Sequence, residues 1–136
     1  LKIAIVGSRN PTVAGTRHAG EFARAFASLS IAVTSGLALG IDSAGHRGAL
    51  AAGGLTLAVL GSGCDVIYPM RHRQLARQIC EKGLLVSEFP LGTRAYPGNF
   101  PRRNRIVTGL SLGTLVVEAQ EQGGSLISAR LAMEQG

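Results

Sequence analysis

The sequence predicts an α/β fold in which a doubly wound, mostly parallel sheet carries helices on both faces. Short apolar runs alternate with longer helical patterns along the chain, and the apolar runs lack the polar alternation of a half-exposed strand. Gly and Ser follow most of these runs. Strands that are apolar on both faces are typical of a parallel sheet buried between helices.

Two strand–helix units are expected in the first part of the chain. Residues 2–6 form a short β-rich run, and residues 16–29 follow as a helix with its large apolar side chains on one stripe. Residues 31–34 form the second strand. Residues 41–52 then form an Ala-rich helix with Asp42 near its N-terminus.

The rest of the chain continues this alternation, with an irregular stretch at 88–99. Further strands are expected at residues 55–60, 84–87 and 114–117. Further helices are expected at residues 71–82, at 103–110, and from the glycines at 123–124 to about residue 134. Because no repeat, low-complexity segment or internal boundary interrupts the pattern, we expect residues 1–136 to form a single domain.

The composition of the 136 residues is that of one globular domain that can bury a real core. The chain opens on a strand and stops right after a helix, so we expect it to be a fragment of a longer chain. Cys64 and Cys80 lack ligand-like spacing and are expected to be buried thiols of a reducing compartment. No signal peptide or membrane-spanning run is present, and a cytoplasmic location is expected.

The basic residues point to a polyanionic ligand. The formal net charge is +6, and 12 of the 14 basic residues are Arg. Arg102, Arg103 and Arg105 fall within four residues, directly after Phe100. Arg carries a planar fork of donors that matches phosphate, and an adjacent aromatic ring can stack on a base. This cluster suits a phosphodiester backbone better than a small apolar ligand.

Four small-residue turns follow predicted strands and are expected to meet at one edge of the sheet. They are Gly7-Ser8-Arg9, Ser35-Gly36, Gly61-Ser62-Gly63 and Gly123-Gly124-Ser125. Ligands of doubly wound sheets bind at the carboxyl ends of the strands, where glycine allows close approach and helix N-termini favour anions. Each turn taken alone is an ordinary loop, but together with Arg9 they predict an anion-binding edge.

The sequence indicates no cofactor and no metal. The first turn lacks the G-x-G-x-x-G fingerprint, and the second strand ends at Ser35, where a dinucleotide-binding chain has an acidic residue. No G-x-x-x-x-G-K-[ST] sequence occurs, which excludes a P-loop. No Cys, His and carboxylate group shows metal-ligand spacing.

The ordered motifs resemble those of the DNA processing protein A (DprA/Smf) family. The motifs are Gly7-Ser8-Arg9, Ser35 to Asp42, Gly61 to Asp65 with Tyr68-Pro69, Ser87 to Pro90, Phe100 to Arg105, and Val116 to Ala119 with Gly124 to Ile127. The resemblance covers essentially the whole chain. It implies a Rossmann-like core that binds single-stranded DNA, forms a homodimer and loads the RecA recombinase onto incoming DNA during natural transformation.

One set of residues is therefore predicted to bind DNA or its phosphates, with no catalytic residue among them. The set is Gly7, Ser8, Arg9, Ser35, Gly36, Gly61, Gly63, Phe100, Arg102, Arg103, Asn104, Arg105, Gly124 and Ser125. Arg9 and the arginine cluster are expected to act in one pocket. Phe100 is open to two interpretations, base stacking or packing, whereas Tyr68 is expected to serve in packing.

Acidic residues near this edge also have two interpretations. Asp42 and His46 share a helix face, where an acid–base pair is possible and a helix N-terminal acid beside an imidazole is favoured. Glu88 and Glu118 follow strands. These two carboxylates are typical either of the catalytic pair of a hydrolase or, as favoured here, of salt bridges that orient Arg103 or Arg105.

An enzyme remains the alternative to a DNA-binding mediator. Phosphoribohydrolases that cleave nucleoside monophosphates share a similar core and carry P-G-G-x-G-T-x-x-E before the late helix. The stretch from Gln122 to Arg130 has neither the Thr nor the Glu, which favours binding over catalysis.

The last helix also carries more apolar side chains than one sheet face needs. They are Leu126, Ile127, Leu131 and Met133. A symmetric homodimer would bury this excess, although packing on the sheet explains it nearly as well.

Overall fold

A five-stranded parallel sheet forms the centre of the structure, with the strand order β4-β3-β2-β1-β5. This computed structural model describes residues 1–120 and 123–136, so Gln122 lies outside the described residues. The strands are β1 (Lys2–Gly7), β2 (Ala32–Ser35), β3 (Thr56–Val59), β4 (Gly83–Val86) and β5 (Thr114–Val117). The helices are α1 (Val13–Ser28), α2 (Ile41–Ala51), α3 (Arg73–Lys82), α4 (Asn99–Gly109) and α5 (Gly124–Gln135), with a 3-10 turn (Met70–His72) before α3.

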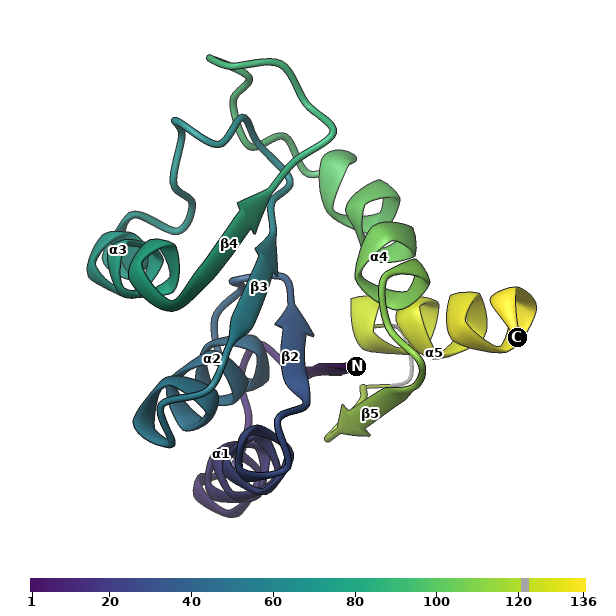
Figure 1. The fold of residues 1–136 in the computed structure, drawn as a ribbon. Coiled ribbons are helices and arrows are strands. Elements are labelled where there is room, and N and C mark those ends of the chain that lie inside the picture. The colour runs from purple at the N-terminus through teal and green to yellow at the C-terminus, as the bar shows by residue number, and fades with distance from the viewer. Residues whose placement is uncertain (121–122) are drawn as a thin grey trace.

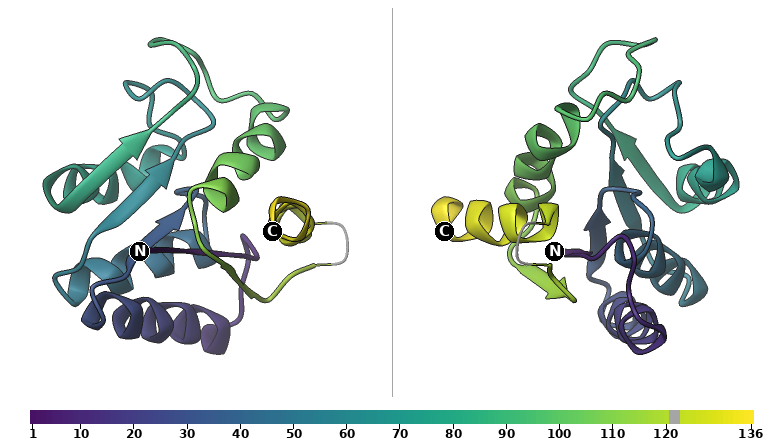
Figure 2. Two further views of the ribbon diagram at one scale, coloured as in Figure 1. Left: turned by 45° about the vertical axis from the view of Figure 1, so that its right-hand side comes forward. Right: turned by 180° about the vertical axis from the view of Figure 1, so that it is seen from behind.

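Helices cover the sheet from both sides. α1, α2 and α3 lie on one face, and α4 and α5 lie on the other (Figures 1 and 2). The first three crossovers step outward from β1 to β4, and the crossover through α4 returns to place β5 on the other side of β1. Right-handed crossovers in opposite directions place their helices on opposite faces. The predicted doubly wound α/β fold is therefore confirmed.

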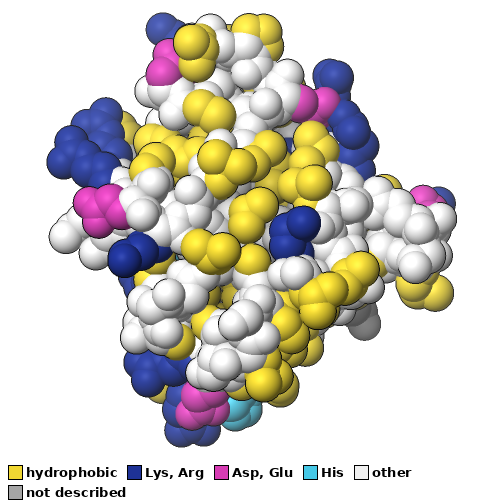
Figure 3. Space-filling model, in the orientation of Figure 1, with side chains coloured by type: hydrophobic (Ala, Val, Ile, Leu, Met, Phe, Trp, Pro, Cys, Tyr) yellow, Lys and Arg dark blue, Asp and Glu magenta, His cyan; other side chains and the backbone are white. Residues whose placement is uncertain are grey.

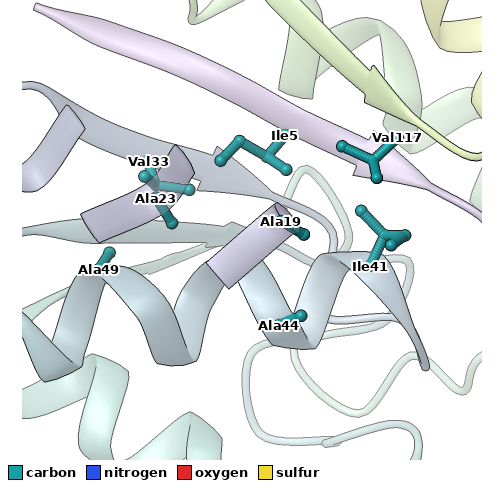
Figure 4. Close-up of a cluster of buried hydrophobic side chains, with 8 residues drawn as sticks. All are labelled: Ile5, Ala19, Ala23, Val33, Ile41, Ala44, Ala49 and Val117. Atoms are coloured by element: carbon teal, nitrogen blue, oxygen red, sulfur yellow. The ribbon is translucent and has the colours of Figure 1, made fainter. Parts of the chain in front are cut away.

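The largest buried cluster lies between the sheet and the first two helices (Figure 4). It consists of Ile5, Val33 and Val117 from the strands, Ala19 and Ala23 from α1, and Ile41, Ala44 and Ala49 from α2. The small alanine side chains let both helices lie close to the branched side chains of the strands, as close packing requires. This packing fixes α2, whose N-terminal end borders the site described below.

Two helices begin earlier than the sequence predicts. α4 begins at Asn99, four residues earlier, because Pro101 falls in its first turn, where a helix needs no backbone N–H donor. α1 begins at Val13 because the Thr12 hydroxyl accepts a hydrogen bond of 3.0 Å from the Gly15 amide and caps the helix. The aromatic and arginine cluster consequently lies on a helix, which sends its side chains in different directions.

The α4 face of the sheet is only partly covered. Hydrophobic side chains gather over β3 and β4 and extend up to α4 on the face of the molecule in Figure 3. Leu85 packs against a buried cluster on the α3 side, so its neighbour Leu84 points to the α4 face, where it is 55% exposed. Within the described residues, no helix is long and apolar enough to cross a membrane.

Candidate functional site

A cleft of about 540 Å³ opens at the carboxyl ends of β1 and β2, beside the start of α5. It lies where the chain reverses direction across the sheet, the place where doubly wound folds bind ligands. Many of the residues predicted to bind DNA or phosphate line it, namely Gly7, Ser8, Arg9, Gly36, Phe100, Arg103, Asn104, Gly124 and Ser125. Four separate stretches of the sequence thus meet at one edge, as predicted.

The Phe100 ring lines the cleft and contacts three other lining side chains. The guanidinium carbon of Arg9 lies 5.2 Å from the ring centroid, and that of Arg103 lies 5.6 Å from it. The Tyr68 ring packs against Phe100 with a centroid separation of 5.7 Å and a tilt of 41°. Tyr68 is 53% exposed, which is more than a side chain that serves only in packing would be. The structure therefore brings Arg9 and Arg103 to one aromatic ring.

Arg103 is a buried residue of the cleft floor, with only 3% of its surface exposed. Its Nη1 donates to the carbonyl oxygens of Gly36 and Val59, the latter at 2.6 Å, and its Nε donates to Asn104 Oδ1 at 3.1 Å. Burial lowers the pKa of the guanidinium below its usual value, and the nearby Asp42 opposes that shift. Because these donors are occupied, Arg103 joins β2, β3 and α4 at the cleft floor.

Gly36 is fitted to this arginine. A Cβ at residue 36 would lie 2.5 Å from the Arg103 guanidinium carbon, closer than real contacts allow. A glycine after β2, predicted as a ligand contact, therefore also makes room for a buried side chain. Gly7 instead allows the close approach of a neighbouring strand, since a Cβ there would lie 1.9 Å from the Val117 carbonyl oxygen.

Asp42 closes the back of the cleft in the first turn of α2. Its Oδ2 accepts hydrogen bonds from the amides of Gly36 at 3.0 Å and Ala38 at 3.3 Å. Burial raises the pKa of this carboxyl, and the positive charge of Arg103 partly counteracts the increase. This is the favoured interpretation of Asp42, a helix N-terminal acid that organises a turn.

His46 does not share a partner with that carboxyl. Its Nδ1 lies 2.7 Å from the Thr56 hydroxyl, and the side chain is fully buried. Burial lowers the pKa of His46 to about 3, so the ring is neutral at pH 7. Asp42 and His46 thus have separate structural partners, which disfavours the alternative interpretation of the two residues as an acid–base pair.

The remaining arginines of the cluster point away from the cleft. Arg102 Nε lies 3.3 Å from Glu88 Oε1, Arg105 Nη2 pairs with Glu88 Oε2, and the Arg102 guanidinium lies over the Phe89 ring at 5.7 Å. Residues three apart on a helix share a face. The prediction that Glu88 forms a salt bridge with Arg105 is confirmed, and the prediction of one pocket for the whole cluster is wrong for Arg102 and Arg105.

Three other predicted residues support the site without lining the cleft. Ser35 is buried, and its hydroxyl donates to the Ile5 carbonyl oxygen at 2.5 Å. Gly61 lies against the Phe100 ring, and the amide of Gly63 donates to the Thr93 carbonyl oxygen at 2.9 Å. These contacts position the strand ends and the adjoining loop, which explains small residues there.

Glu118 has a structural role that the sequence prediction missed. Its carboxylate accepts hydrogen bonds from the Thr12 amide, at 2.8 Å, and from the Thr12 hydroxyl, and these bonds lower its pKa. The prediction that Glu118 pairs with an arginine is wrong, because it joins the start of α1 to the end of β5 instead.

Several lining residues were not predicted, among them Asn10, Ala38, Pro97, Ile127 and Ser128. Asn10 directly follows a predicted motif. Ile127 and Ser128 lie one helical turn beyond Gly124, so helical spacing was an available signal. Within residues 1–120 and 123–136, no group of His, Cys, Asp and Glu side chains is placed to hold a metal ion.

The fold and the cleft define a Rossmann-like α/β domain with a basic, aromatic cleft at its topological switch point. The profile of the family described as DNA recombination-mediator protein A matches residues 1–136, and the chain belongs to that family. Protein Smf of Escherichia coli K12 is 49% identical over all of this chain, which corresponds to 37% of Smf.

Two solved structures agree with this assignment. The X-ray structure of DNA processing protein A from Streptococcus pneumoniae has a TM-score of 0.90 and 40% identity, over 99% of this chain and 47% of that one. A Helicobacter pylori DNA processing protein A, described for its unique single-stranded DNA binding mode, has a TM-score of 0.93 and 34% identity, over 99% of this chain and 61% of that one. The chain thus spans between 37% and 61% of the length of these three proteins.

Proposed function

We propose that the cleft binds single-stranded DNA without reading its sequence, as part of a recombination mediator that loads RecA onto incoming DNA during natural transformation. The family assignment supports a role in recombination. The single-stranded DNA binding mode described for the Helicobacter pylori relative supports the choice of ligand. The cytoplasmic location expected from the sequence is part of this proposal.

The observation that carries the proposal is the Phe100 ring flanked by Arg9. The ring is half-buried and lines the cleft, and we assign it the contact with one base; the exposed Arg9 guanidinium, 5.2 Å from the ring centroid, is assigned the contact with a phosphate. Base stacking on aromatic rings contributes about 1–3 kcal/mol per base and requires an unpaired strand. Phosphate contacts supply affinity that does not depend on sequence.

The cleft walls add uncharged donors and a pre-arranged floor. The turn at Gly7 and Ser8 and the start of α5 at Gly124 and Ser125 face the cleft from two sides. Backbone amides at the start of a helix such as α5 favour an anion, whereas the Ser8 amide already donates to the Val117 carbonyl oxygen at 3.4 Å. Because Arg103 is already bonded to carbonyl oxygens, we assign it the positioning of Phe100 in place of a direct phosphate contact.

Binding without catalysis fits the acidic groups of the cleft. Asp42 is the one carboxylate among the described lining residues, it is 7% exposed, and its oxygen is occupied by two amides. A carboxylate that acts as a general acid or base must lie within hydrogen-bond reach of the substrate. We therefore expect that incubation with AMP releases no adenine, and release of the base would restore the phosphoribohydrolase alternative.

We also include a homodimer in the proposal. α5 exposes Leu126, Ile127 and Met133, the last to 85%, and a symmetric pair would bury these side chains. Sedimentation at micromolar concentration is expected to show a dimer, and a monomer at all concentrations would remove this part of the proposal. Pairing would set two clefts side by side for one strand.

The proposal is tested by titrating labelled oligonucleotides into the protein at several salt concentrations. Single strands are expected to bind more tightly than the corresponding duplex, since a duplex hides its base faces from Phe100. The Phe100→Leu variant keeps apolar volume but loses the ring, and is expected to weaken single-strand binding by about 1–3 kcal/mol. Tighter binding of duplex would overturn the proposal.

A further inference from the structure

A second hollow of about 950 Å³ lies beside the cleft. We call it the α3 groove. It is bounded by the segment 64–70, by the side of α3 that carries Arg73 and Arg77, and by Leu85 and Ala95. Nothing in the function proposed above uses it, although it is larger than the cleft itself.

Tyr68 connects the two hollows. Among the described residues it is the one side chain that lines both, and it is 53% exposed. Its ring packs on Phe100 at 5.7 Å on the cleft side. A strand with one base on Phe100 therefore meets a second exposed aromatic ring before it reaches the α3 groove.

The groove offers cations along one wall. Arg73 and Arg77 are exposed and lie one helical turn apart, about 6 Å along the axis. Among the described ion pairs of the chain, neither guanidinium takes part. A spacing of one helical turn suits neighbouring phosphates of an extended strand, and partially exposed Ile67 and Leu85 supply apolar surface for bases.

Two acidic side chains also line the groove. The Asp65 carboxylate accepts hydrogen bonds of 2.8 Å and 3.0 Å from the Gly92 amide, which ties the loop before α4 to the groove wall. Glu81 lies one turn beyond Arg77, toward the C-terminal end of α3. A polyanion that enters at Tyr68 therefore meets Arg73 and Arg77 before it reaches Glu81.

We propose that the α3 groove is a second subsite for single-stranded DNA, where a strand leaving Phe100 passes Tyr68 and places its next phosphates on Arg73 and Arg77. This inference rests on the single-strand binding proposed for the cleft. It adds the side of α3 that carries Arg73 and Arg77 to the proposed binding surface. Continuity through Tyr68 and two arginines that take part in none of the described ion pairs favour a nucleic acid over a peptide as the occupant.

Affinity as a function of strand length tests the subsite. Oligothymidylates from about two to about twelve nucleotides are titrated into the wild type and into the double variant Arg73→Gln/Arg77→Gln. The matched control is Arg17→Gln/Arg24→Gln, which removes the same charge from exposed positions of α1. The α3 variant is expected to bind the shortest strands like the control, and to bind long strands more weakly, with the salt slope lowered by about 1.4 for the two lost phosphate contacts.

A thiol provides a second, local measurement. Cys80 is exposed and lines the groove, and the sequence prediction of a buried thiol is wrong for this residue. In a Cys64→Ser background, alkylation of Cys80 by a neutral maleimide is expected to slow severalfold with saturating long strands and to stay unchanged with the shortest ones. Equal protection by both lengths would contradict the inference.

The outcomes separate the two proposals. If the wild type binds no single strand, the function proposed for the cleft fails. If the wild type binds single strands but the α3 variant matches the control at every length and Cys80 is not protected, the cleft proposal stands and the α3 subsite is refuted.

Discussion

Replacing Arg103 with methionine is expected to destabilise the fold far more than the same change at its neighbour Arg102. Arg103 is 3% exposed and donates to the Gly36 and Val59 carbonyl oxygens, and Met fills a similar volume without those donors. A hydrogen bond to a charged group contributes roughly 1.5–3 kcal/mol. Arg103 forms no ion pair with Asp42 among the described residues, but its positive charge partly offsets the burial of that carboxyl, and leaving a buried charge uncompensated costs up to roughly 3–5 kcal/mol.

These contributions overlap, so we expect a loss of about 3–5 kcal/mol in the free energy of unfolding. Arg102→Met is the matched control, since its side chain is 63% exposed and its ion pair with Glu88 is worth less than about 1 kcal/mol. Urea denaturation followed by circular dichroism at pH 7 measures both. The difference between the two free energies of unfolding is calculated from the two urea midpoints, provided that the m values are equal.

A second variant keeps the prediction testable if Arg103→Met does not fold. Adding Asp42→Asn removes the uncompensated carboxylate and is expected to recover part of the lost stability. Arg103→Lys keeps the charge but not the planar fork, and is expected to fall between wild type and Arg103→Met. If the free energy of unfolding of Arg103→Met lies within about 1 kcal/mol of that of Arg102→Met, the structural role of Arg103 is refuted.

Two further predictions concern buried groups near the cleft. The folded-state pKa of His46, about 3, lies below its unfolded value near 6.5, so its stabilisation is complete above pH 6.5 and decreases as the pH falls toward 3. Between pH 7 and pH 5, protonation of His46 is expected to lower the free energy of unfolding by about 2 kcal/mol. In urea titrations, His46→Leu should lose this pH-dependent decrease, and the control His18→Gln should keep it. Gly36→Ala forces a methyl into the Arg103 guanidinium and is expected to lower both stability and DNA affinity, whereas Gly98→Ala, which meets no atom within 4 Å, should change stability by less than about 1 kcal/mol. Equal thermal midpoints for the two alanine variants would contradict the close fit at Gly36.

The sequence predicted the fold because its signals are local. Apolar runs, the small residues that follow them and the helical periodicity lie within short windows, and the direction of a parallel sheet brings all strand ends to one edge. Arg9, Phe100 and Gly124 therefore met in the cleft as predicted, although they are far apart in the chain.

The roles of individual side chains depend on geometry that the sequence does not display. Arg102 and Arg103 are neighbours in the sequence, but a helix that starts at Asn99 turns one toward solvent and the other into the floor. From the sequence, this helix was predicted to start at Arg103, and the whole arginine cluster was predicted to share one pocket with Arg9. Glu118 was missed for a different reason, since its partner Thr12 lies 106 residues away.

The salt dependence of single-strand binding by Arg9→Gln tests the central claim, that the cleft holds DNA through Phe100 and Arg9. Arg9 is exposed beside the ring and forms none of the ion pairs found among the described residues. Between about 50 and 200 mM salt, the slope of log affinity against log salt should be about 0.7 smaller in magnitude for Arg9→Gln than for wild type. The control Arg17→Gln, on α1, should keep the wild-type slope, and an unchanged slope and affinity for Arg9→Gln would contradict the account.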